Sequence, residues 1–68
     1  MERVIIEGAL ETPDGAWRVE VVRRPGRGRW YRVVHDGTVV DWLTIDGVRT
    51  MLADAGVELA TLVEVTPR

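Results

Sequence analysis

Arginine residues gathered around one tryptophan are the part of this sequence best suited to chemistry. All nine basic residues of the chain are arginine, and six of them lie within residues 17–32 together with Trp30. A guanidinium group binds phosphate or carboxylate bidentately, and an indole among such groups can stack on a base or anchor a protein interface. This region therefore suits two classes of partner, proteins and nucleic acids.

We predict a protein interface, formed by the face of a sheet around Trp30. Apolar residues of that face, ringed by arginine, match the apolar core and polar rim of an interface. The partner would be a second copy of the chain or another protein, and the contact residues would be Trp30, Arg24, Arg32, Val34, Val39 and Leu43. The competing interpretation is that residues 57–65 or the N-terminal segment cover this face internally.

Nucleic acid is the alternative partner, bound by the arginine-rich sheet face and the loop of residues 25–29. The contact residues would then be Arg18, Arg24, Arg27, Arg29 and Arg32. Three carboxylates on the same face, those of Glu7, Glu20 and Asp41, weaken this interpretation. Phosphate binding is favoured by a positive surface that carboxylates do not interrupt.

Catalysis, metal binding and cofactor binding are not expected. The chain has one histidine, no cysteine and no serine. His35 has one carboxylate beside it, Asp36, but no nucleophile, so we expect it to be structural. The acidic residues are scattered, without the spacing of metal ligands.

Length and composition indicate one small globular domain, spanning residues 1–68. The chain is 46% hydrophobic and has no disulfide to stabilise it, so stability must come from apolar packing, self-association or a partner. No apolar run approaches the roughly 20 residues that span a bilayer. The first residues do not resemble a secretory signal, so we expect a cytoplasmic protein that does not bind membranes.

The elements that position these residues begin with a hairpin. Residues 28–35 and 38–43 flank Asp36-Gly37, a dipeptide that favours the two-residue type I′ turn. That turn predicts the cross-strand pairs His35–Thr38, Val33–Val40, Arg32–Asp41 and Tyr31–Trp42. Trp42 would then face the core, and Leu43 the outside beside Trp30.

Two further strands are predicted, at residues 4–10 and 17–24. A turn at residues 12–15 would place Leu10 beside Trp17 and Ile6 beside Val21. The Pro- and Gly-rich residues 25–28 end the second strand. Because a one-residue slip exchanges the faces, we predict an odd-numbered loop or a glycine bulge here, with the pairs Val21–Val33 and Val19–His35.

A helix is predicted from Ile45 to Ala55, with Thr44 as its N-cap and Gly56 at its C-terminal end. The alternating residues 57–65 favour a strand over a short helix. The fold class is therefore α+β: an antiparallel four-stranded β-meander with one α-helix packed on one face and a C-terminal strand or short helix. The residues expected to face the helix are Ile6, Leu10, Trp17, Val19, Val21, Tyr31, Val33, Val40 and Trp42.

Overall fold

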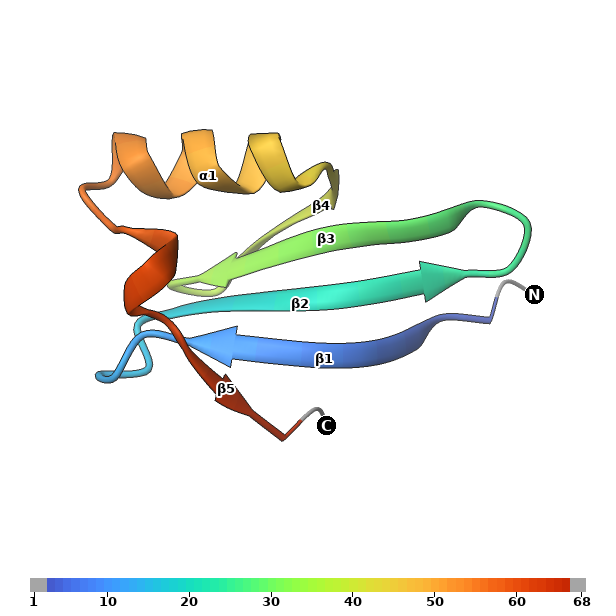
Figure 1. The fold of residues 1–68 in the computed structure, drawn as a ribbon, viewed down its shortest axis with the longest axis horizontal. Helices are drawn as coiled ribbons and strands as arrows, with labels where there is room; N and C mark the ends of the chain where they lie inside the picture. Colours follow the sequence, from blue (N-terminus) through green and yellow to red (C-terminus); the bar gives the residue numbers. More distant parts are fainter. Residues whose placement is uncertain (1–2, 67–68) are drawn as a thin grey trace.

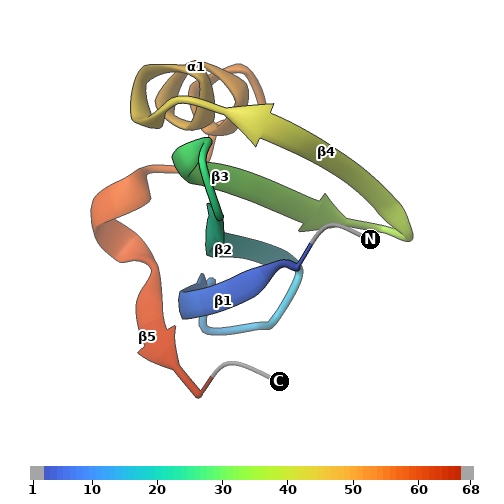
Figure 2. The same cartoon turned by 90° about the vertical axis from the view of Figure 1, so that its right-hand side faces the viewer.

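An antiparallel sheet with a helix on one of its faces is seen in the computed structural model, which describes residues 3–66 (Figure 1). The strands are β1 (Ile5–Glu11), β2 (Trp17–Arg24), β3 (Gly28–His35), β4 (Thr38–Leu43) and β5 (Val63–Val65). They lie in the order β4-β3-β2-β1-β5 (Figure 2). The predicted α+β class and four-strand meander are confirmed.

The β3–β4 turn forms as its dipeptide predicts. Asp36 and Gly37 have φ angles of 50° and 76°, as a type I′ turn requires. His35 pairs with Thr38, and Val33 with Val40. Near the turn, the side chains of the hairpin therefore lie on the faces that the sequence predicts.

A bulge in β4 overturns the predicted pairing of Tyr31 with Trp42. After Val33–Val40 the register shifts, so that Tyr31 pairs with Leu43 and Trp42 has a φ of 61°. A bulge inserts one extra residue and so exchanges the faces beyond it. Trp42 lies on the outer face, not in the core, and Leu43 packs against the helix-side core, not outside as expected.

The β2–β3 connection is an odd-numbered loop, as predicted. Three residues lie between the paired Arg24 and Gly28, whereas the predicted pairs Val21–Val33 and Val19–His35 require a loop two residues longer, so those pairs are wrong by two residues. Val19 pairs instead with Val33. Because a shift of the pairing by two residues is even, each side chain still lies on the predicted face of the sheet.

The β1–β2 pairing also differs from the prediction. Leu10 pairs with Val19, not Trp17, because the connecting turn closes with Thr12 donating its N–H to the Trp17 carbonyl at 3.0 Å. A bulge at Glu7 then shifts Ile6 beside Val22. Ile6 therefore lies on the outer face and not, as expected, beside Val21.

The helix α1 (Ile45–Asp54) begins and ends at its predicted signals. The Thr44 hydroxyl accepts a hydrogen bond from the Gly47 N–H at 3.1 Å. At the other end, Gly56 has a φ of 76°, and the Val57 N–H donates to the Leu52 carbonyl at 2.8 Å. This arrangement is the Schellman motif, which stops a helix where glycine can adopt the left-handed conformation.

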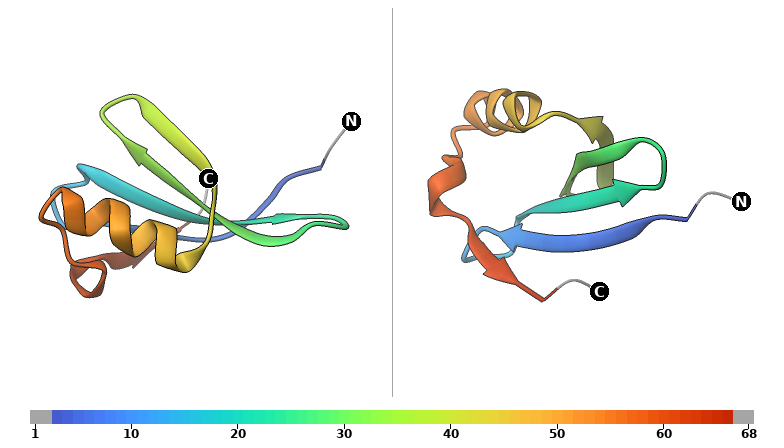
Figure 3. Two further views of the ribbon diagram at one scale, coloured as in Figure 1. Left: turned by 90° about the horizontal axis from the view of Figure 1, so that it is seen from above. Right: turned by 45° about the vertical axis from the view of Figure 1, so that its right-hand side comes forward.

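The main core lies between α1 and the sheet, as the views in Figure 3 show for the two layers. Its buried residues are Val19, Val33, Val48, Leu52 and Leu62. After α1, the chain forms the short helix η1 (Leu59–Thr61) and then β5, which pairs with β1. The C-terminal segment thus contains both a short helix and a strand. It packs Leu59 and Leu62 on the helix side, so residues 57–65 do not cover the outer face.

Replacing the N-cap hydroxyl tests how much the helix depends on its cap. We expect Thr44→Ala to lower the free energy of unfolding by about 1 kcal/mol, because one helical N–H loses its acceptor. Thr50→Ala, on the exposed surface of α1, is the matched control and should leave stability unchanged or raise it slightly. Urea denaturation followed by circular dichroism measures both; equal effects of the two substitutions would contradict the prediction.

The outer sheet face as a candidate protein-binding site

The outer face of the sheet is organised in rows that cross its strands. One row is apolar and consists of Ile6, Val22 and Trp30, to which the bulge adds Trp42. The next row contains Glu20 and Arg32. A third row, nearer the β3–β4 turn, runs through Glu11, Arg18, Val34 and Val39.

An alternating chain of ion pairs links the charged residues of this face. Its members, in order, are Glu11, Arg18, Glu20, Arg32, Asp41 and Arg24. Arg18 binds Glu20 at 2.9 Å, and Arg32 lies 3.2 Å from both Glu20 and Asp41. Arg24 holds Asp41 with two hydrogen bonds, of 2.7 and 3.3 Å. The network joins β1, β2, β3 and β4, and its charges balance.

Part of this network is buried, although it lies on the face without the helix. Glu20 is 8% exposed and Arg24 5%, and the neighbouring Val22 is fully buried. A buried charge is tolerated only where partners satisfy it. The ion pairs are therefore structural groups of the outer face, and the surface available to a partner is made by the residues above and beside them.

Two tryptophans form the centre of that surface, and the buried guanidinium of Arg24 lies beneath them. The Arg24 guanidinium lies 4.0 Å from the centroid of the Trp42 ring, a cation–π contact. Trp42 in turn meets Trp30 edge to face, with centroids 5.4 Å apart. The Trp30 indole N–H donates to the Arg27 carbonyl at 2.8 Å. Both indoles are thus held in place, while Trp42 stays 45% exposed.

Asp41 holds the strained bulge from which Trp42 projects. Its carboxylate accepts the Trp42 backbone N–H at 2.8 Å and is bound by Arg24 and Arg32. A left-handed conformation costs a bulky residue about 1–2 kcal/mol. The ion pairs and the hydrogen bond from Trp42 to Asp41 therefore hold Trp42 in a left-handed backbone conformation that it would not otherwise adopt.

The same contacts hold the pKa of the Asp41 carboxyl below its ordinary value. The hydrogen bonds from Arg24 are the largest cause, and the Trp42 N–H and the positive charge of Arg32 act in the same direction. Burial acts against them by raising the pKa. The charged form of Asp41 is thus favoured in the folded chain.

The structure brings together most of the residues predicted for a protein interface. Trp30, Arg24 and Arg32 lie on the outer face, with Val34 half-buried and Val39 56% exposed. Leu43 is the exception, because it faces α1. Arg24 and Arg32 lie beneath and between the apolar residues, not around them as the expected rim.

The arginines of the nucleic-acid alternative divide into two groups. Arg18, Arg24 and Arg32 are bound to carboxylates within the network. Arg29 is 63% exposed in its side chain and pairs with Glu7 at 3.0 Å, and Arg27 lies in the exposed β2–β3 loop. These five guanidinium groups therefore do not form one continuous surface.

His35 takes part in packing on the helix side. Its ring stacks on Trp17 with centroids 3.7 Å apart, and its Nδ1 lies 2.7 Å from the Ala16 carbonyl. Because a carbonyl can only accept, Nδ1 carries the proton and donates it. This contact fixes the ring against the β1–β2 turn.

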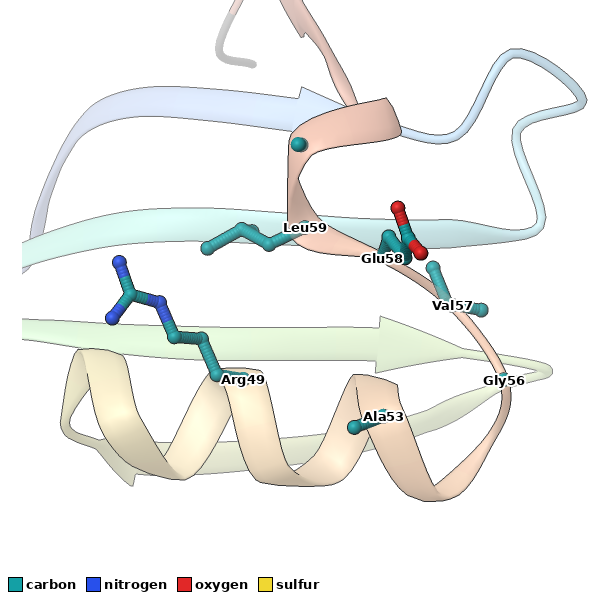
Figure 4. A pocket seen from close by; sticks show the side chains of 7 residues that line it. Arg49, Ala53, Gly56, Val57, Glu58 and Leu59 are labelled. Atoms are coloured by element: carbon teal, nitrogen blue, oxygen red, sulfur yellow. The ribbon is translucent and has the colours of Figure 1, made fainter.

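An open groove of about 540 Å³ lies between α1 and η1. Arg49 and Leu59 line it from opposite sides, and Glu58 stands near its far end (Figure 4). Within residues 3–66, no three acidic or histidine side chains lie close enough together to hold a metal ion. Neither helix in the described part of the chain has the length and apolar character needed to cross a membrane.

Strict strand alternation places both Ile6 and Trp42 in the core, although both lie on the outer face; of the two, Trp42 is the one in the exposed surface. One signal could have placed it: Leu43 precedes the N-cap and Val48 is the fourth helical residue, the two positions of a hydrophobic staple. A staple requires Leu43 to face the helix, and the neighbouring Trp42 must then face away.

No family model, no curated protein and no solved structure matches the chain. The function therefore has to be inferred from the arrangement of the outer face itself.

Removing the charge of Asp41 tests the network. We expect Asp41→Asn to lower the free energy of unfolding at neutral pH by about 2–3 kcal/mol, because two guanidinium groups lose a charged acceptor. The exposed Asp54→Asn in α1 is the control and should have little effect.

The loss of folding stability at acidic pH should come in part from protonation of Asp41. A carboxyl whose pKa is lowered on folding stabilises the fold above its ordinary value of 3.8, and this contribution disappears as the pH falls through the lower, folded value. Urea titrations from neutral to acidic pH should therefore show a smaller loss of stability in Asp41→Asn than in the wild type. Parallel losses would contradict this role of Asp41.

Proposed function

We propose that this chain is a non-catalytic interaction module that binds an apolar surface of another protein chain on its outer sheet face. The contact surface consists of Trp30, Trp42, Val34 and Val39, with Arg24 and Arg32 below and between them. The partner is either a second copy of the chain or a different protein.

The observation that carries this proposal is the conformation of Trp42. A strand without the bulge would turn this indole toward the helix, where Leu43 now packs. Instead, the backbone of Trp42 is left-handed, with a φ of 61°. Its side chain, the largest type there is, stays nearly half exposed. Strained residues of this kind are concentrated at functional sites.

The charges of the face favour a protein partner over nucleic acid. Arg18, Arg24 and Arg32 already bind three carboxylates. Binding of phosphates would have to break these pairs, and two of the groups concerned, Arg24 and Glu20, are more than nine-tenths buried. An apolar partner could cover the indoles without disturbing the network. Fixed aromatic residues of this kind are typical binding hot spots.

Trp42→Gly tests the proposal, because glycine accepts the left-handed conformation without strain. The probe is a display library of random peptides selected on the folded wild-type chain. We expect selected peptides to lose affinity by about tenfold or more in Trp42→Gly, the loss typical of a hot-spot residue. Val39→Asp, which leaves the ion pairs intact, should weaken the same peptides.

Arg49→Ala in the groove between α1 and η1 is the control and should bind as the wild type does. Some peptides could bind Trp42→Gly and Val39→Asp as tightly as the wild type but lose affinity for Arg49→Ala. That result would show that peptides bind in the groove, and it would contradict the proposal. Light scattering of wild type and Trp42→Gly over a concentration series shows whether a second copy is the partner.

The nucleic-acid alternative predicts a different result. Contacts between arginine and phosphate weaken steeply as salt rises. We expect the chain to bind random duplex or single-stranded DNA no more tightly than about 10⁻⁴ M at physiological salt, the weak end of non-specific binding. Tighter, salt-dependent binding that Arg27→Ala/Arg29→Ala abolishes would support the alternative instead.

A further inference from the structure

Within residues 3–66, the first half of β1 is an open sheet edge. β5 pairs only with Ala9, Leu10 and Glu11, and Figure 1 shows β5 alongside that end of β1 alone. Among residues 3–66, no strand lies beside residues 5–7 on this edge. Val4 and Ile5 are 40% and 47% exposed here. An exposed apolar edge is a template for pairing with another chain.

The sequence of this edge is complementary to itself in the antiparallel direction. Residues 3–7 read Arg-Val-Ile-Ile-Glu: a cation, three apolar residues and an anion. If Ile5 faces its own counterpart, Val4 faces Ile6 and Arg3 faces Glu7 of the second copy. Directly opposite residues lie on the same face of a sheet, so apolar pairs meet and the charges are opposite.

The contacts that Glu7 already makes leave room for this pairing. Its two oxygens accept from Arg23 at 3.2 Å and Arg29 at 3.0 Å. A carboxylate offers about four acceptor positions, so another guanidinium can bind from the open side.

We infer that two copies of the chain associate by antiparallel pairing of residues 3–7 about a two-fold axis at Ile5. The two-fold axis stands perpendicular to the sheets, so both helices lie on one side and both Trp30–Trp42 pairs on the other. A strand pair of this length buries less than about 1,200 Å², which is typical of weak, reversible association. The dimer would present two copies of the outer face to one side, where a partner with two matching sites gains avidity.

Single cysteines test this register, because the chain contains none of its own. Ile5→Cys places a thiol next to its symmetry mate, within the separation that a disulfide needs. Val39→Cys reports association through the outer face, and Ala53→Cys, exposed on α1, reports random collision. Each variant is checked by circular dichroism, oxidised at equal concentration and followed on non-reducing gels.

We expect Ile5→Cys to form disulfide dimers about tenfold or more faster than the other two, because pairing raises the local thiol concentration. Arg3→Glu added to Ile5→Cys should slow the reaction, and sedimentation of the cysteine-free wild type should show a dimer that Arg3→Glu weakens. Equal rates for all three cysteines, or a monomeric wild type, would overturn the inference and leave the peptide test of the outer face unaffected. Faster reaction of Val39→Cys would also overturn it, while supporting the outer face as a self-association surface.

Discussion

The bidentate pair of Arg24 and Asp41 is the interaction on which the outer half of this molecule depends. Arg24 comes from β2 and Asp41 from β4, so the pair bridges the strand between them, where Arg32 also binds Asp41. Because Arg24 is almost wholly buried, a change of register that separates the pair would leave a buried guanidinium without its acceptor. Such a mispaired sheet would be strongly disfavoured. We infer that the network selects the register more than it adds net stability.

The same aspartate connects sheet pairing with the exposure of the indoles. By accepting the Trp42 N–H, Asp41 holds the bulge that turns Trp42 outward and Leu43 inward. Leu43 then contributes to the core beneath α1, immediately before the Thr44 cap. One local irregularity thus serves the helix, the ion pairs and the proposed binding surface together. For that reason we regard the bulge as a functional part of the fold and not as a defect in β4.

Local signals predicted much of the fold, and interactions between distant segments determined the rest. The Asp36-Gly37 turn, the Thr44 cap and the Gly56 stop each depend on a few neighbouring residues, and all form as expected. The bulge at Glu7 has no such signal, and the bulge near Trp42 is indicated only indirectly, by the staple positions of Leu43 and Val48. Both bulges depend on which side chains meet across the sheet, such as the carboxylate of Asp41 and the guanidinium of Arg24. Strict alternation therefore placed Trp30 correctly and Trp42, only one strand away, on the wrong face.

The left-handed backbone at Trp42 has a consequence for how this sequence would drift over generations. Glycine and asparagine adopt that conformation far more easily than tryptophan does, so mutation toward either would be favoured wherever the indole had lost its use. If tryptophan is kept at this position, then selection acts against substitutions that would relieve the backbone strain. The residue found there in descendants of this chain would thus record whether natural selection still maintains the exposed ring.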